Sequence, residues 1–216
     1  MSQTLETVPE KAQEVLQFWF GAVPGRRLRS RLKLLSRIIY WAGNWGRLLM
    51  DVDGILRARF AGELERAASG AYDHWTATTH GRLALLILLD QVSRNIFRGT
   101  QRAFACDAKA LDIALHALEA GDDKNVHGVA QSFIYLPLMH QEKLEIQDRT
   151  VALYRGALRE ARGVIECLIL GAEYLSALRH RQIIRKFGRF PHRNLVLGRS
   201  STPAERRFLR QPFSTF

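Results

Sequence analysis

Apolar residues recur at helical spacing along most of the 216-residue chain. In residues 26–41, for example, Leu28, Leu32, Leu35 and Ile39 form one face of a helix, and polar residues occupy the opposite face. Similar patterns predict a first helix ending at Phe20 and further helices over 51–68, 107–120, 131–140, 142–160 and 165–187. No segment alternates apolar and polar residues as a strand does. The sequence therefore predicts an all-α fold of about eight helices.

One predicted helix is apolar on every side. Residues Leu83–Leu89 read LALLILL and form the longest apolar run without a charge. A helix without a polar face is expected in the core. Seven residues cannot cross a bilayer, which needs about 20.

The clearest boundary signals lie near the C-terminus. Thr202 at the N-cap, Pro203 at the first helical position and Glu205 two residues later form a capping box, which predicts a last helix near Pro203. Gly188 can adopt the left-handed backbone conformation that commonly ends an α-helix, so residues 188–201 are predicted to form a long loop. Further boundaries are expected at Thr78 or Thr79 and at Asp107, and a kink or a boundary is expected at Pro137.

Short connections between consecutive helices predict antiparallel pairs within a single domain, residues 1–216. Such pairs stack in a right-handed array like that of tetratricopeptide-repeat proteins, or form an irregular bundle. No repeat of regular period distinguishes the two arrangements.

The net charge of +11 is unevenly distributed. Residues 26–47 contain seven basic side chains and no acid, which leaves +4 for the rest of the chain. This basic amphipathic segment, extending to residue 50, could lie at the periphery and contact an anionic membrane or nucleic acid. A surface helix docked by its leucine face explains Arg26–Trp41 equally simply, and we favour that interpretation.

Two cysteines, Cys106 and Cys167, give neither a disulfide framework nor a metal-binding spacing. The N-terminus lacks the basic start and apolar stretch of a signal peptide. We therefore expect a reduced, cytoplasmic protein.

Polar side chains follow the buried helix. Asp90 and Arg94, and also Arg94 and Arg98, stand four residues apart, so a continuous helix would carry all three on one stripe. Together with Asn95, the two arginines would clamp a carboxylate or phosphate, since each guanidinium can donate two hydrogen bonds. The alternative is an ion pair of Asp90 with Arg94.

His140 and Glu142 stand at a helix junction. One histidine and one glutamate do not make a metal site, and no HExxH motif or Cys/His cluster accompanies them. We expect no metal and no cofactor. His140 is either a hydrogen-bonded structural histidine or an acid–base group, and Glu142 is either a first-turn helix residue or part of a site.

The segment KFGRFPHRN, residues 186–194, combines aromatic anchors with many donors. Arg189, His192, Arg193 and Asn194 follow a helix that carries His180. These side chains either tie the loop to the protein or form an anion site. His140, His180, His192 and Glu142 are the candidate catalytic residues. The sequence contains no GxSxG elbow, Walker loop or dinucleotide fingerprint, so whether the protein is an enzyme stays open.

Four blocks of the sequence resemble the bacterial family known as domain of unknown function 924. They are VLQFWFG, RLALLILLDQVSRNIFRGTQRAFACDAKAL, FIYLPLMHQE and HRQIIRKFGRFPHRNLVLGRSSTPAE. The resemblance implies a helical fold similar to tetratricopeptide-repeat proteins but no established activity. After FWFG, members usually show a short acidic and aromatic passage, whereas this chain has the basic stretch up to Met50.

The leading hypothesis is a helical protein whose arginine- and histidine-lined cleft binds a small carboxylate or phosphate. Its expected ligand-binding residues are Arg94, Asn95, Arg98, Arg189, Arg193 and Asn194. One alternative is a non-enzymatic scaffold for a peptide or protein partner, and another is association with a membrane or nucleic acid through residues 26–47.

Overall fold

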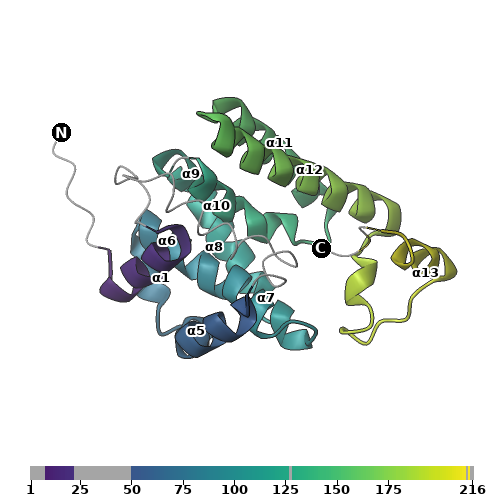
Figure 1. The fold of residues 1–216 in the computed structure, drawn as a ribbon, viewed down its shortest axis with the longest axis horizontal. Helices are drawn as coiled ribbons and strands as arrows, with labels where there is room; N and C mark the ends of the chain where they lie inside the picture. The colour runs from purple at the N-terminus through teal and green to yellow at the C-terminus, as the bar shows by residue number, and fades with distance from the viewer. Residues whose placement is uncertain (1–7, 22–49, 127, 213, 215–216) are drawn as a thin grey trace.

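The computed structural model describes residues 8–21, 50–126, 128–212 and 214 (Figure 1). Within these ranges the chain is helical and contains no strand, so the all-α prediction is confirmed. The longer helices are α1 (Glu10–Phe20), α5 (Val52–Ser69), α6 (Thr79–Leu86), α8 (Asp107–Glu119), α10 (Val129–Met139), α11 (Leu144–Glu160) and α12 (Val164–Phe187). The shorter ones are η1 (Asp73–Ala77), η2 (Ile87–Val92), α7 (Ser93–Ile96), η3 (Gln101–Phe104), α9 (Asp122–Asn125), η4 (Pro191–Arg193) and α13 (Pro203–Leu209).

The uncharged run Leu83–Leu89 lies at the centre of the core, as its composition predicted. Each of its residues is at most 1 % exposed. Helix α6 packs against α1, α8 and α10, and its continuation η2 packs against α5. This run can be apolar on all sides because helices surround it.

The central helix changes its hydrogen bonding midway. Its α-helical part ends at Leu86, the next six residues are π-helical, and α-helix resumes over Ser93–Ile96. The periodicity of the sequence predicted no such change. Stretches of π-helix are rare and are often found at functional sites. Asp90 lies within this one.

Helices α11 and α12 form an antiparallel pair, seen side by side along one edge in Figure 1. Arg181 is hydrogen-bonded to Asp148 at one end of the pair, and Leu158 approaches Gly171 nearer the other end. Helix α10 instead runs parallel to α12. Ser132 of α10 lies close enough to Glu173 of α12 to lower the pKa of its carboxyl, and two turns later the ring centres of His140 and His180 are 6.2 Å apart. The likeness to a tetratricopeptide-repeat array stays a prediction.

The long loop after α12 is ordered and partly helical. Gly188 adopts the predicted left-handed conformation, and η4 forms a 3₁₀ turn. The capping box of Thr202 and Glu205 is present at the start of α13. A second, smaller core anchors this region through Ile183, Ile184, Phe190 and Phe208.

Three local predictions were wrong. Asp107 is not an N-cap: the cap is Cys106, and Asp107 is the first residue of α8, where its carboxylate binds Arg94. Glu142 precedes α11 instead of lying in its first turn. Arg98 follows the end of α7, so it does not continue the stripe of Asp90 and Arg94.

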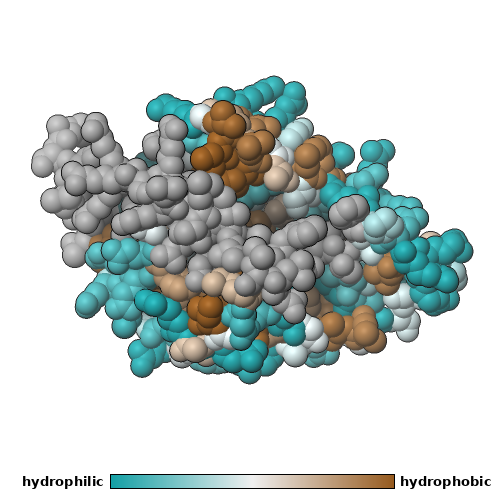
Figure 2. Space-filling view, viewed as in Figure 1, coloured by the Kyte–Doolittle hydropathy of each residue, from teal (hydrophilic) through white to brown (hydrophobic). Residues whose placement is uncertain are grey.

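Apolar side chains are exposed along one face of α12. Val164, Leu168 and Leu175 are 75 %, 68 % and 66 % exposed. Figure 2 shows apolar surface on the part of the molecule where Figure 1 places α11 and α12. None of the helices in the described ranges is both long and apolar enough to cross a membrane. The basic segment 26–50, apart from Met50, lies outside the described residues.

Candidate functional site

A buried aspartate and a histidine form the centre of the site. Nδ1 of His140, at the end of α10, lies 2.7 Å from Oδ1 of Asp90 in η2. Nε of Arg94 lies 3.2 Å from the same Nδ1 but also 3.3 Å from Oδ1 of Asp90, to which it can donate instead. Because the ionised carboxylate can only accept a hydrogen bond in the shorter contact, we assign the ring proton to Nδ1 and the lone pair to Nε2. Burial opposes ionisation of Asp90, but His140 and Arg94 hold the pKa of this carboxyl well below its usual range. Burial and the Arg94 charge lower the pKa of His140, although Asp90 opposes them.

Arg94 joins this pair to a second carboxylate. Its guanidinium lies 3.2 Å from Oδ1 of Asp90 and donates to Oδ1 of Asp107 at 2.8 Å. The same group lies 5.4 Å from the centre of the Phe104 ring. Arg94 therefore links the two carboxylates, although the shortest hydrogen bonds of Asp90 are those with Gln91, at 2.6 Å, and with His140.

Arg193 is less well satisfied. It is 6 % exposed, and its closest carboxylate contact is the 3.6 Å ion pair from Nη1 to Oδ2 of Asp107. Its guanidinium lies close to two rings, 4.8 Å from the centre of Phe104 and 4.5 Å from that of Phe190. Its buried Nε has no hydrogen-bond partner in the described parts of the chain. Burial and the Arg94 charge lower the pKa of Arg193 to about 10.

Two further histidines complete the cluster. The His180 ring lies 6.2 Å from that of His140 and 5.3 Å from Phe190. Its Nδ1 lies 2.8 Å from the Ser176 carbonyl oxygen. Burial and His140 keep the pKa of His180 well below its usual value, and burial together with Arg193 and Arg94 lowers the pKa of His192 to about 4. Both histidines are neutral at pH 7.

Glu142 fixes the loop that carries Arg193. Its Oε1 accepts the backbone N–H of Phe190 at 2.8 Å, and its carboxylate binds both terminal nitrogens of Arg199. Burial opposes ionisation of Glu142, but Arg199 and the Phe190 N–H lower its pKa below the usual value. Glu142 therefore positions Phe190 and, through it, the Arg193 guanidinium.

The remaining predicted ligand-binding residues bind the protein elsewhere. Arg98 holds the carboxylate of Asp53 and the side-chain oxygen of Asn95. Arg189 holds Glu205 through two hydrogen bonds of 2.7 and 2.9 Å. Asn194 donates to the Ser201 hydroxyl at 3.0 Å. The structure thus brings Arg94 and Arg193 together, along with His140, His180 and His192.

Asp107, Phe104 and Phe190 are site residues that the sequence did not reveal. Asp107 had the appearance of a helix cap, and no spacing linked it to Arg94 or Arg193. Phe104 resembled an ordinary core residue, and Phe190 was expected only as an aromatic anchor of the loop, with nothing to link it to Arg193. Asp90 had been visible as an ion-pair partner of Arg94, but its contact with His140, 50 residues away, had no local signal.

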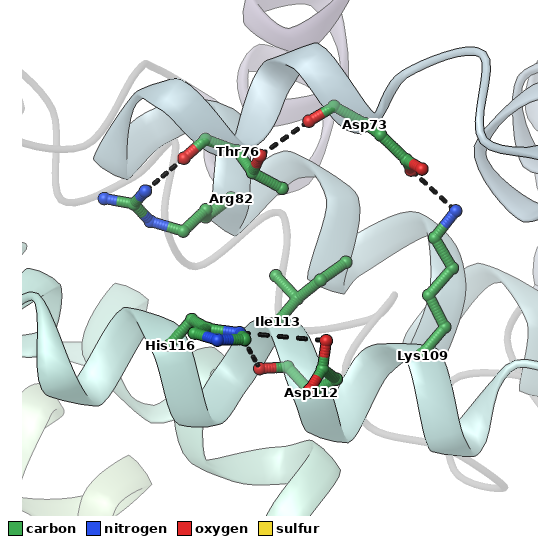
Figure 3. Close-up of a pocket in the computed structure, with 7 residues that line it drawn as sticks. All are labelled: Asp73, Thr76, Arg82, Lys109, Asp112, Ile113 and His116. Atoms are coloured by element: carbon green, nitrogen blue, oxygen red, sulfur yellow. Dashed lines mark hydrogen bonds and ion pairs between the residues drawn. The ribbon is translucent and has the colours of Figure 1, made fainter.

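A separate open pocket of about 490 Å³ lies between η1, α6 and α8 (Figure 3). Its cations already have protein partners. Lys109 binds Asp73 at 2.6 Å, and Arg82 binds Asp122 and the Thr76 carbonyl oxygen. Asp112 and His116 lie at its exposed side. Among the described residues that line this pocket, each charged side chain therefore has a protein partner or is exposed.

Across the described ranges, no three histidine, cysteine, aspartate or glutamate side chains converge so as to hold an ion. The expectation of a metal-free site concerns the whole chain and stays a prediction.

Comparison with known proteins places the chain in a family. No curated protein matches it. A solved structure, that of the protein of unknown function ATU0120 from Agrobacterium tumefaciens, is 31% identical, with a TM-score of 0.69 over 93% of this chain and 97% of that one. The model of the bacterial proteins of unknown function DUF924 matches residues 15–213. This match spans nearly the whole chain, and the protein therefore belongs to the DUF924 family.

Proposed function

We propose that the cluster around Arg94 and Arg193 binds a small anion, a carboxylate or a phosphate. The proposal rests on Arg193, a buried charge whose hydrogen bonding is incomplete. Its guanidinium is buried, its Nε lacks a described partner, and its nearest carboxylate oxygen is 3.6 Å away. A buried charge is costly unless it is paired and hydrogen-bonded. A ligand oxygen would supply the missing contact.

The surroundings of Arg193 suit a bound anion. The rings of Phe104 and Phe190 lie close to the guanidinium and keep water away from it, which strengthens its electrostatic interactions. Arg94 shares Asp107 with it and adds a second positive charge. The side chains of Arg94, Asp107 and His140 remain 18 %, 17 % and 13 % exposed, so the cluster reaches the surface on this side.

Of the six ligand-binding residues expected from the sequence, two belong to the proposed anion site. Arg94 and Arg193 remain as anion ligands, with His140, His180 and His192 around them. The other predicted ligand-binding residues are assigned a structural role in this proposal, because each is hydrogen-bonded to another part of the protein. They are Asn95, Arg98, Arg189 and Asn194.

Calorimetric titration with phosphate, sulfate and acetate tests the proposal. We expect saturable binding of at least one of them, with a ligand-dependent rise in melting temperature. Arg193→Gln should weaken the binding at least tenfold. The matched control is Arg181→Gln, because Arg181 pairs with Asp148 on the exposed side of α11 and α12. Equal affinities for the two variants would contradict the proposal.

A second candidate function rests on the exposed face of α12. Val164, Leu168 and Leu175 project from it, with Gly171 near the middle of the stripe. We name a second copy of the chain as the partner, because an antiparallel α12 would place Leu168 of each copy opposite Leu175 of the other around Gly171. Sedimentation velocity of the wild type and of Leu168→Glu tests this proposal. A wild-type monomer at 100 μM, about the concentration at which weak dimers form, would refute it.

Binding of residues 26–47 to a membrane or nucleic acid stays a prediction. Deletion of that segment should abolish salt-dependent retention on anionic vesicles or DNA if the prediction is right.

A further inference from the structure

We infer that His140 takes up a proton at Nε2 when an anion binds beside Arg94 and Arg193, so that the cluster binds its ligand together with a proton. This inference rests on the proposed anion site. It assigns a chemical role to the Asp90–His140 pair and defines the ligand as an acid group.

The charges of the free cluster already balance. Arg94 and Arg193 contribute two positive charges, and Asp90 and Asp107 contribute two negative charges. The neighbouring histidines are neutral at pH 7. An added anion would leave uncompensated negative charge among groups that are largely removed from water, which is unfavourable. One proton restores the balance.

His140 is the histidine best placed to hold that proton. Its Nδ1–H is hydrogen-bonded to a carboxylate, which stabilises the imidazolium form. His180 instead has a neutral carbonyl oxygen, that of Ser176, at its Nδ1. Nε2 of His140 has no hydrogen-bond partner in the described parts of the chain, because the polar atoms within hydrogen-bond distance of this ring, on Asp90 and Arg94, both lie at Nδ1. A proton at Nε2 could therefore be donated directly to a ligand oxygen.

The groups around His140 explain why the uptake depends on the ligand. The titratable and charged groups around His140 come from four elements: Asp90 from η2, Arg94 from α7, Arg193 and His192 from η4, and His180 from α12. The two guanidinium charges disfavour a third positive charge in the free protein. An anion bound to the guanidinium groups would offset their repulsion, and the pKa of His140 would then rise.

Sulfate is the most direct probe because it does not titrate between pH 5 and 8. Calorimetric titration at pH 7 in two buffers of different ionisation enthalpy gives the number of protons bound per sulfate. We expect roughly 0.5–1 proton taken up, and an affinity that rises up to about tenfold for each unit by which the pH falls. Histidine-edited NMR of the wild type, with and without sulfate, should show the His140 pKa rising by roughly one unit or more.

Three variants assign the proton. His140→Gln should bind sulfate without proton uptake. Asp90→Asn keeps an acceptor for Nδ1–H but removes the charge that stabilises imidazolium, so it should bind sulfate with reduced uptake. His116→Gln, at an exposed histidine in the other pocket, should behave as the wild type. Circular dichroism checks that each variant is folded, and the NMR experiment on the wild type requires no variant.

The outcomes separate this inference from the proposed function. Sulfate binding that depends on Arg193 but takes up no proton overturns the inference and leaves the anion site intact. Uptake that persists in His140→Gln also overturns it, because another group then holds the proton. Failure of sulfate, phosphate and acetate to bind the wild type overturns both.

Discussion

Nδ1 of His140 lies 2.7 Å from Oδ1 of Asp90, although 50 residues separate them in the chain. Asp90 comes from a π-helical stretch, and His140 caps the helix that contains Pro137 near its end. Two irregular helix segments therefore meet at the site. Their meeting connects the buried central helix to the histidines and arginines of the C-terminal half.

Glu142→Gln should destabilise the protein by about 1–3 kcal/mol, since hydrogen bonds to a charged, partly buried group are lost. The amide keeps one acceptor for the Phe190 N–H but cannot bind both nitrogens of Arg199. Urea denaturation measures the effect. Glu145→Gln, at an exposed position in the first turn of α11, is the control and should change the stability by less than about 0.5 kcal/mol. Equal effects would show that Glu142 does not anchor the loop.

His192→Gln should protect the protein against mild acid. The pKa of His192 is about 4 in the folded protein, against about 6.5 when unfolded. Between these values the unfolded state binds the extra proton, so the stability of the wild type falls as the pH falls. The variant lacks this contribution and should gain about 1–2 kcal/mol relative to the wild type between pH 7 and pH 5. Urea titrations at both pH values test this, and a difference independent of pH would contradict it.

Glu173→Gln should stabilise the protein above neutral pH. Part of the Glu173 side chain reaches the surface, and its buried Oε2 has no well-formed hydrogen bond in the described parts of the chain. Burial raises the pKa of Glu173 to about 7, and the nearby Ser132 offsets only part of this effect. The folded state therefore holds a proton that the unfolded state releases above about pH 4.3, and stability decreases as the pH rises to 7. Because the side chain is partly exposed, solvent screening reduces the effect. We expect the variant to be more stable than the wild type by about 1–3 kcal/mol at pH 8 and nearly equal to it at pH 4. A less stable variant at pH 8 would indicate an undetected partner.

Thr202→Ala should cost about 0.5–2 kcal/mol, because the Thr202 hydroxyl accepts the Glu205 N–H at the start of α13. Thr202→Ser should restore most of the stability, since it keeps the hydroxyl. Glu205→Gln should also destabilise, because Arg189 and the Thr202 N–H both donate to this carboxylate. Thermal unfolding at pH 7 measures all three, and a neutral Thr202→Ala would refute the role of the cap.

Two glycine substitutions should have opposite effects. A Cβ at Gly81 would lie 2.1 Å from the Trp75 carbonyl oxygen, so Gly81→Ala requires the backbone to move and should cost several kcal/mol, on the order of 2–4. A Cβ at Gly62, within α5, would meet nothing within 4 Å. Gly62→Ala should stabilise the protein by about 0.5–1 kcal/mol, since alanine favours helix. Chemical denaturation of both variants checks the pair, and destabilisation by Gly62→Ala would contradict the prediction.

Local patterns determined much of the fold. Apolar spacing located α5, α11 and α12 closely, and the uncharged run Leu83–Leu89 identified the buried centre. The capping box fixed the start of α13, and Gly188 marked the end of α12. These signals act between residues a few positions apart, so the sequence contains them in full. The blocks resembling DUF924 also identified the family from the sequence alone.

Only the tertiary structure decided which polar groups belong together. Arg98 and Arg189 looked as suitable for a ligand as Arg94 and Arg193, yet they face Asp53 and Glu205. Asp107 looked like a cap, yet it contacts both arginines of the site. An arginine binds whichever carboxylate the packing brings near, and helix packing joins residues tens of positions apart. The sequence determined which helices form and which is buried, whereas the partners of each charge depended on how those helices pack.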